Sequence, residues 1–371
     1  MRDAAVTIRD VAREAGVSVA TVSRVFNRSH VVTAGLRARV LAAAERLGYV
    51  AYGAARALAS GRSRAIGAIV PTLDNPVFAI CIDALQERLD QHGFALLVAS
   101  AGYDAARETR EVRLLLERGV DGLMLVGAEH PDDVWALLRR RGPAVSAVAT
   151  WTSDATVTPV PCIGFDNAAA ARRLVDHLLE LGHRRIAMVA GPTAGNDRAA
   201  ARVAGVRAAL AAAGVTLAEP YLCERPYTVP DGYAAARAML SLPDPPTAIV
   251  CGNDHLALGA LAGARALGLA VPHDLSITGF DDLDFAAYAE PPLTTVRVPA
   301  AEMGRRAAEY LMAAASGTPA PAGTVLEAPV MLRSSTASPP TQGRAARRQP
   351  HGPHPASGPR QAAASPRRPA G

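Results

Sequence analysis

The chain has 371 residues, half of them hydrophobic, and a formal net charge of +5. This length suffices for two or three packed cores, and no apolar run approaches the roughly 20 residues that cross a membrane. Residues 1–64 carry eleven arginines against four acidic residues, and residues 338–371 carry six arginines and no acidic residue, so the body between them is net acidic. Such a basic head on an acidic body is typical of a protein that binds nucleic acid with one end.

Two short helices separated by a glycine are predicted near the N-terminus. The first covers Ile8–Ala15, starts with Thr7 and Asp10 in capping-box spacing, and ends at Gly16. The second begins after Ser18, a good N-cap residue. Their apolar faces can pack at a steep crossing angle through Val11, Ala12, Ala15, Val22 and Val25. This is the layout of a helix-turn-helix, which offers its second helix to the DNA major groove; the alternative is a small helical bundle without that role.

The second helix, Ser18 to Asn27, is the candidate recognition helix, and a third helix predicted from about Ala34 to Leu47 completes the head. Val19 and Ala20 near its N-terminus cannot hydrogen-bond a base but can touch a thymine methyl group. Arg24, one turn further on, can bind guanine O6 and N7 with two hydrogen bonds, or else a phosphate. The other polar candidates suit phosphate contacts: Ser18, Thr21, Ser23, Asn27 and His30. His30 can equally be an exposed loop residue without a role.

Beyond a linker at residues 50–64, short apolar runs alternate with longer amphipathic stretches as far as residue 334. The predicted strands are Ala65–Val70, Phe94–Ala99, Gly122–Val126, Val145–Ala149, Arg185–Ala190, Thr247–Cys251, Leu275–Phe280, Thr294–Val298 and Val325–Leu332. Helix-like stretches between most of them indicate parallel sheets covered by helices on both faces. The strands are too many for one ordinary sheet, so we predict two similar α/β lobes, with the chain crossing between them near residues 162–164, 291–292 and 323.

Several motifs of the head form one pattern: Asp10-Val11-Ala12, Ala15-Gly16-Val17-Ser18, Thr21-Val22-Ser23-Arg24-Val25 and Asn27. In this pattern the chain resembles the LacI/GalR family of bacterial transcriptional regulators, and the resemblance continues to about Thr336. It implies a ligand-responsive, dimeric, DNA-binding repressor. The implied fold is an all-α helix-turn-helix head plus α/β, with two doubly wound parallel-sheet lobes of periplasmic-binding-protein type that close on a small ligand.

We expect a helix-turn-helix DNA-binding domain at residues 1–49, a hinge segment at 50–64, a two-lobed effector-binding and dimerisation domain at 65–336, and a disordered basic tail at 337–371. The block Ala54–Ala59 matches the family's hinge segment. The resemblance implies that Leu58 wedges between base pairs in the minor groove, and Arg56 can meet a phosphate nearby. The alternative for this segment is a helix packed on the core.

Loops after strand C-termini form the candidate effector site, because open α/β sheets bind ligands there. These loops carry Asn75, Phe78, Trp151, Asn196, Asp197, Arg198, Arg202, Tyr227, Asn253 and Asp281. The resemblance implies that Arg202 and Asp281 hold hydroxyl or carboxylate groups of the ligand, and that Phe78 and Trp151 stack on it. Aromatic faces ringed by Asn, Asp and Arg suit a carbohydrate, whereas two arginines also suit an anion. The alternatives are ordinary core aromatics and a structural ion pair between Arg202 and Asp281.

The predicted function is a transcriptional regulator that binds a palindromic double-stranded operator as a homodimer, under control of a sugar or sugar derivative. We expect no enzyme activity, because no phosphate-binding glycine loop, nucleophile elbow or metal-ligand cluster is present. The four cysteines lack CxxC spacing, so we expect buried thiols, no metal and no other cofactor. No signal peptide is expected, which favours a cytoplasmic protein. The alternative function is a sugar-binding receptor without regulatory DNA binding, which the helix-turn-helix argues against.

Overall fold

The computed structural model describes residues 6–27, 32–49, 62–153, 158–320 and 323–340. The predictions for His30, Arg56 and Leu58, and for the tail from residue 341 onward, lie outside the described residues. No helix in the described ranges is long and apolar enough to cross a membrane.

Three helices form the head: α1 (Ile8–Ala15), α2 (Val19–Asn27) and α3 (Ala34–Arg46). At the start of α1, the backbone N–H and the hydroxyl of Thr7 donate to Asp10 Oδ2 at 2.9 and 2.6 Å. At the start of α2, Ser18 Oγ accepts a hydrogen bond from the backbone N–H of Thr21 at 3.2 Å. One fully buried valine from each helix enters the common core: Val11, Val22 and Val40. The predicted helix-turn-helix and its third helix are therefore confirmed.

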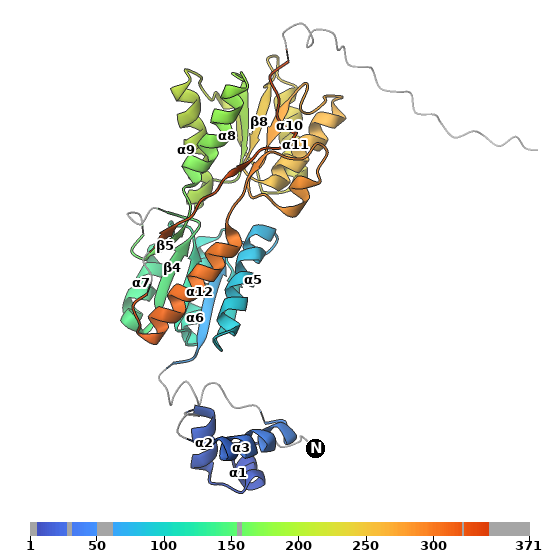
Figure 1. The fold of residues 1–371 in the computed structure, drawn as a ribbon. Helices are drawn as coiled ribbons and strands as arrows, with labels where there is room; N and C mark the ends of the chain where they lie inside the picture. Colours follow the sequence, from blue (N-terminus) through green and yellow to red (C-terminus); the bar gives the residue numbers. More distant parts are fainter. Residues whose placement is uncertain (1–5, 28–31, 50–61, 154–157, 321–322, 341–371) are drawn as a thin grey trace, which may run out of the picture. The chain divides into compact units, whose positions relative to one another are not determined.

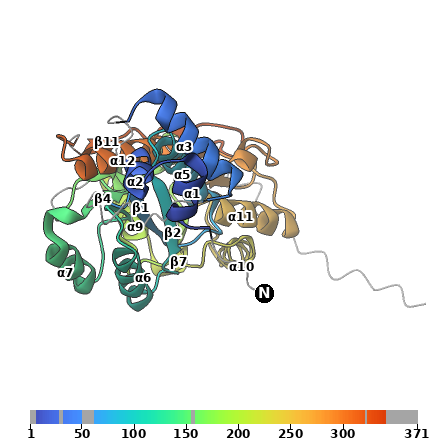
Figure 2. The same cartoon turned by 90° about the horizontal axis from the view of Figure 1, so that it is seen from below.

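The first lobe contains a six-stranded parallel sheet in the order β11-β5-β4-β3-β1-β2. Its strands are β1 (Ala65–Val70), β2 (Ala95–Ser100), β3 (Gly122–Val126), β4 (Ser146–Thr150), β5 (Cys162–Gly164) and β11 (Thr324–Val325). Helices α5 (Pro76–Asp90) and α12 (Ala300–Ser316) cover one face, and α6 (Ala105–Glu117) and α7 (Asp132–Arg141) cover the other (Figures 1 and 2). Strand β3 is apolar throughout because both its faces are buried in this way.

The second lobe repeats the plan with a four-stranded parallel sheet in the order β7-β6-β8-β9. Its strands are β6 (Ile186–Ala190), β7 (Leu222–Glu224), β8 (Ala248–Cys251) and β9 (Ser276–Thr278). Helices α8 (Asn167–Glu180) and α9 (Asp197–Ala212) pack on one face, and α10 (Val229–Leu240) and α11 (Asp254–Ala266) pack on the other (Figure 1).

Short 3-10 turns lie in both lobes, at Gly142–Ala144 in the first and at Glu219–Tyr221 and Asp284–Ala287 in the second. The predicted fold class, two doubly wound lobes after a helical head, is confirmed.

The crossings between the lobes differ in part from the prediction. The first follows β5, as expected. The second follows β10 (Thr295–Val296) and lies beyond the predicted Pro291-Pro292, because β10 still pairs with β12 (Val330–Met331) in the second lobe. The single strand predicted over Val325–Leu332 is wrong: its start belongs to β11 in the first lobe and its end to β12. The β10–β12 pair is antiparallel, whereas the sequence predicted parallel sheets only.

Candidate DNA-binding helix and effector site

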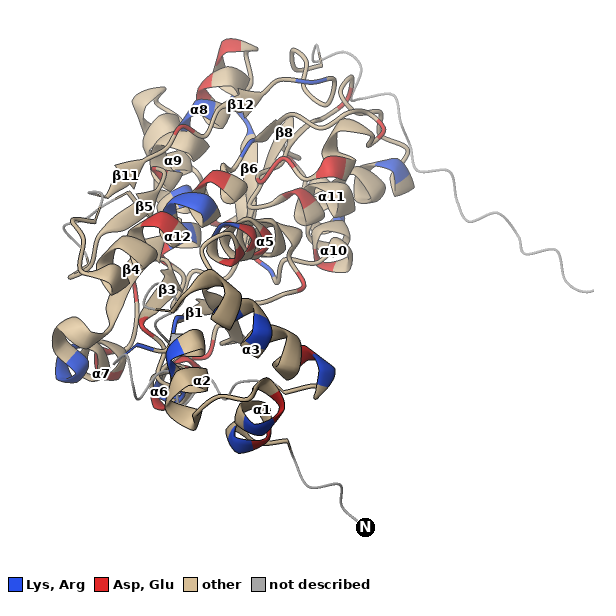
Figure 3. Cartoon of the chain, turned by 60° about the horizontal axis from the view of Figure 1, so that its bottom comes forward, with Lys and Arg blue, Asp and Glu red and all other residues tan. Residues whose placement is uncertain are grey.

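The outward face of α2 carries the residues predicted to read DNA. Val22 and Val25 point into the core of the head, whereas Ala20 and Arg24 are exposed and Val19 is 41% exposed. An exposed large apolar side chain beside a basic one suits contact with a base edge better than contact with water. Ser18 at the helix start is also exposed, while Thr21 and Ser23 are half-buried. Basic residues also mark α1 and α3, together with some acidic ones (Figure 3).

Three asparagines begin helices at the edges where parallel strands end. Asn75 Oδ1 accepts from the backbone N–H of Val77 at the start of α5, 3.1 Å away. Asn196 starts α9 and Asn253 starts α11 through the same kind of bond, at 3.4 and 2.9 Å. Asparagine is among the best N-cap residues because its side-chain oxygen satisfies an N–H that the helix leaves unpaired. Because these caps use the Oδ1 atoms, the Nδ2 groups of the three asparagines are available as hydrogen-bond donors to other groups.

The strand ends surround a cavity of about 20 Å³, here called the anchor cavity. Its lining comes from both lobes: Asn75, Val77, Phe78, Tyr103, Trp151, Asn196, Arg198, Arg202, Tyr227, Asn253 and Asp281. Nine of the ten predicted effector-site residues are in this lining, and Asp197 is not. A volume of this size holds about one water molecule. A larger ligand therefore requires lining side chains or the lobes to move.

Two lining side chains carry buried polar atoms without a hydrogen-bond partner: Asn253 Nδ2, a donor, and Asp281 Oδ2, an acceptor. Such atoms are rare in folded proteins, since leaving a buried donor or acceptor unpaired costs about 1–3 kcal/mol. Burial raises the pKa of Asp281 to about 6, against the opposing effects of the Arg202 charge and a hydrogen bond with Asn75. The cavity therefore presents an unsatisfied donor and an unsatisfied acceptor together.

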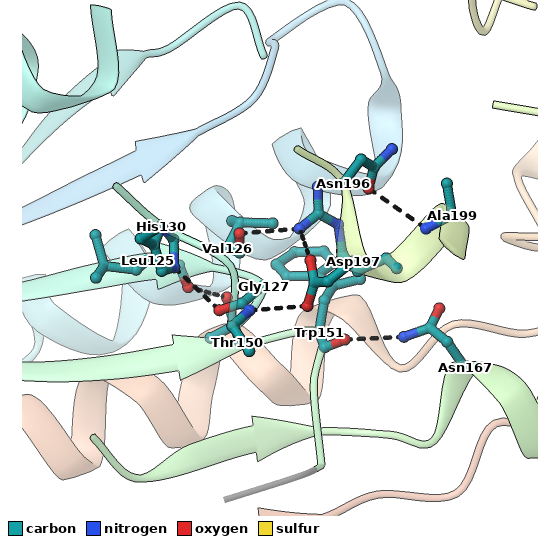
Figure 4. A network of polar contacts seen from close by, with 12 residues as sticks. Leu125, Val126, Gly127, His130, Thr150, Trp151, Asn167, Asn196, Asp197 and Ala199 are labelled. Carbon is teal, nitrogen blue, oxygen red and sulfur yellow. Dashed lines mark hydrogen bonds and ion pairs between the residues drawn. The ribbon is translucent and has the colours of Figure 1, made fainter. Parts of the chain in front are cut away.

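Arg202 is held by protein groups other than Asp281. Its Nε donates to Asn167 Oδ1 at 2.9 Å and its Nη1 donates to the carbonyl of Gly252 at 2.7 Å. The guanidinium also lies over the ring of Phe280, 3.7 Å from the ring centroid, a favourable cation–π arrangement. Asn167 Nδ2 in turn donates to the carbonyl of Trp151 at 2.9 Å (Figure 4). Arg202 is therefore connected through Asn167 to Trp151 of the first lobe. Its hydrogen bonds go to Asn167 and Gly252, so they do not support the alternative of a structural ion pair with Asp281.

Asp197 and Arg198, at the start of α9, bond to the backbone of the first lobe. Figure 4 shows Asp197 next to Val126 and Gly127. Asp197 Oδ2 accepts from the backbone N–H of Ala128 at 2.8 Å, and Arg198 Nη1 donates to the carbonyl of Val126 at 3.0 Å. The two side chains also pair with each other at 2.7 Å. Gly127 lies between the two bonded backbone groups with a φ of +94°. We call these contacts the Gly127 latch; Asp197 serves in it and does not face the cavity.

Aromatic rings and strained backbone mark the same place. Phe78 and Trp151 are almost fully buried, with ring centroids 5.1 Å apart. Trp151, Tyr103 and Asp281 have φ values of 59°, 58° and 120°. Residues other than glycine rarely adopt positive φ, and such strain is concentrated at functional sites. Three strained residues in one cavity lining support a role in binding.

Tyr103 and Val77 line the cavity and were not among the predicted residues. Tyr103 follows β2 in the loop that leads to α6, so the rule that found the other candidates also covers it. Its ring lies 6.5 Å from that of Tyr227. Val77 follows the Asn75 cap by two residues, and nothing in its residue type indicates a cavity.

A helix-turn-helix head followed by two α/β lobes around a polar cavity defines a DNA-binding regulator with a ligand-binding domain. The profile of the bacterial regulatory proteins of the lacI family matches residues 7–51, and that of a periplasmic binding protein-like domain matches residues 175–336. The HTH-type transcriptional repressor CytR of Escherichia coli K12 is 33% identical over 336 residues, covering 90% of this chain and 97% of CytR.

Two solved structures extend the comparison. The lac repressor dimer bound to operator and the anti-inducer ONPF shares 30% identity at a TM-score of 0.79, covering 90% of this chain and 100% of that one. A CelR–cellobiose complex shares 32% identity at a TM-score of 0.65, covering 89% and 99%. This chain therefore belongs to the lacI family of bacterial regulatory proteins, and it is a DNA-binding transcriptional repressor.

Proposed function

We propose that the protein is a homodimeric repressor whose affinity for a palindromic operator is controlled by a sugar or sugar derivative in the anchor cavity. The DNA-binding residues in this proposal are Ser18, Val19, Ala20, Thr21, Ser23, Arg24, Asn27 and His30, with Arg56 and Leu58 from the hinge. The domain division given above is part of the proposal, as are location in the cytoplasm, where chromosomal DNA is available, and the absence of enzyme activity.

The observation that carries the effector class is the unpartnered pair, Asn253 Nδ2 and Asp281 Oδ2. A hydroxyl group both donates and accepts, so neighbouring hydroxyls of a sugar can satisfy both atoms. Phe78 and Trp151 supply apolar faces for the C–H surface of a sugar ring. Both lining arginines are already bound to protein acceptors, Arg202 to Gly252 and Arg198 to Val126, which favours a neutral ligand over an anion. The CelR–cellobiose relative supports the same class.

Thermal unfolding with a panel of sugars, followed by operator binding with each hit, tests this function. A ligand at 100 times its Kd adds about 2.7 kcal/mol of stability, a shift that is readily measured. We expect at least one sugar to stabilise the protein and to change its operator affinity. Stabilisation without any operator binding by the full chain would instead support the sugar-binding receptor. No stabilisation by any sugar would reject a carbohydrate effector.

Replacing Arg24 by alanine should reduce discrimination between operator and random DNA more than it reduces binding to random DNA. Loss of a two-bond contact to guanine costs about 1–3 kcal/mol at one base pair in each half-site. Fluorescence anisotropy with operator variants measures this cost, and Arg13→Ala, on the exposed side of α1, is the control. Equal weakening on all sequences would identify Arg24 as a phosphate contact.

Effector affinity should fall as the pH falls below about 6. The pKa of Asp281 is raised by burial to about 6, and a protonated carboxyl loses the charge that strengthens a hydrogen bond from a ligand hydroxyl. If the ligand binds only the ionised form of Asp281, effector affinity should be about tenfold lower at pH 5 than at pH 7. Calorimetric titration from pH 5 to 8 checks this. A flat profile would show that the ionised form of Asp281 is not required.

A further inference from the structure

A second, larger cavity adjoins the anchor cavity. It has a volume of about 260 Å³ and lies beyond the ends of β1 and β3, beside the start of α6. We call it the side cavity. Tyr103 and Arg198 line both cavities, so the two cavities are neighbours at these side chains. At roughly 30 Å³ per water molecule, the side cavity has space for about nine waters, or for one further ring of a ligand.

The side cavity differs chemically from the anchor cavity. The apolar part of its lining, here called the floor, consists of Ile69, Val70, Pro71, Ala101 and Val126. Acidic residues also line it: Asp104, Glu108 and Glu129. Glu108 is bound to His130, at 2.6 Å from Nδ1, and Arg198 is bound to Asp197. The excess of carboxylates disfavours a phosphate or carboxylate on the ligand, whereas an apolar surface together with a few polar groups suits an uncharged ring.

Tyr103 is placed to divide or join the two spaces. Tyr103 is 39% exposed, whereas Phe78 and Trp151 are almost fully buried and Tyr227 is half-buried. Side-chain rotation in an exposed residue is fast and needs no change of the core. The anchor cavity is too small for a sugar, and Tyr103 lines both cavities. Movement of its ring would enlarge the anchor cavity toward the side cavity.

We propose that the effector spans both cavities and is therefore a glycoside of disaccharide size, with an uncharged second ring in the side cavity. One ring is anchored by Asp281 and Asn253, as in the proposed function on which this inference rests. The other ring lies on the apolar floor of the side cavity against Tyr103. A monosaccharide would leave this second space empty and would lose the contacts that it offers.

The test compares two tryptophan variants at neighbouring exposed positions of α6. Ala105 lines the side cavity, whereas Ala106, which is also exposed, does not. Ala105→Trp should block the side cavity, while Ala106→Trp is the matched control for the bulk added to the helix. Affinities are measured by calorimetry for cellobiose, maltose, trehalose and lactose, and for glucose and galactose. Circular dichroism checks that both variants fold.

We expect at least one disaccharide to bind ten times more tightly than its component monosaccharides. Ala105→Trp should remove that preference and leave monosaccharide affinity within twofold, and Ala106→Trp should change neither. Sugar binding that Asp281→Asn weakens but Ala105→Trp leaves intact would overturn the inference while the proposed function stands. Equal affinity for monosaccharides and disaccharides would overturn it in the same way. No binding of any sugar would reject the proposed function, and this inference with it.

Discussion

Asp281→Asn should strongly weaken the response to the effector while leaving the protein as stable as the parent, or more stable. Burial raises the pKa of Asp281 to about 6, so the folded protein holds this proton more tightly than the unfolded chain does. The stability that Asp281 contributes is therefore present at low pH and is lost as the pH rises from about 4 to about 6. At neutral pH the buried carboxylate is ionised, which costs at most about 3 kcal/mol of folding stability. An asparagine carries no charge and removes this cost.

The same substitution removes the charged acceptor that we propose binds the effector. A hydrogen bond to a charged group contributes about 1.5–3 kcal/mol, so we expect effector affinity to fall by roughly 10- to 150-fold. Operator affinity without effector should not change. Melting curves and operator titrations with and without effector measure the two effects separately.

Asp282→Asn is the matched control, because Asp282 is adjacent but does not line the cavity. Its carboxylate is bound to Arg297 and Arg333 at 2.7 and 2.6 Å. Removing that charge should lower the melting temperature and leave effector affinity nearly unchanged. If Asp281→Asn lowered the melting temperature as much as Asp282→Asn and kept the effector response, Asp281 would be a structural residue and not a ligand contact.

Gly127→Ala should weaken effector binding by opening the Gly127 latch. A Cβ atom at this position would overlap Arg198 Nη1 and Asp197 Oδ1. Both side chains would have to leave their places, and with them the bonds to Val126 and Ala128. A ligand that contacts residues of both lobes binds best when the lobes are held together. Losing the latch should therefore lower effector affinity. Couplings of this kind are typically about 1–3 kcal/mol, or 5- to 150-fold.

Gly119→Ala separates this effect from backbone strain. Gly119 also has a positive φ, +78°, but a Cβ there would meet nothing within 4 Å. Both variants should lose stability, by about 1–2 kcal/mol, because an alanine disfavours left-handed backbone. Only Gly127→Ala should change effector affinity in a calorimetric titration. Equal effector affinities in the two variants would show that the latch does not contribute to binding.

Much of the fold was predictable because its signals are local. Ser18 caps α2 by bonding to a residue three positions away, and apolar runs such as Gly122–Val126 form strands because both faces are buried. Most of the candidate effector residues were predictable for a related reason. Parallel strands place their C-terminal ends along one edge of a sheet, so polar residues after each strand are brought together wherever the sheet forms.

The remaining features depend on contacts between distant segments. β12 pairs antiparallel with β10, and Asp197 turns to the backbone of Ala128, a residue of the other lobe. The pKa of Asp281 also depends on burial that several segments create jointly. Short-range patterns were enough to predict the helices of the head, most strands, the helix-turn-helix and the family. Three features of the site could be seen only in the folded protein: the unpaired polar atoms in the anchor cavity, the bonds that already hold its arginines, and the place of Tyr103 in the lining of both cavities. Each of these follows from how side chains of both lobes pack together, and no local pattern encodes that packing.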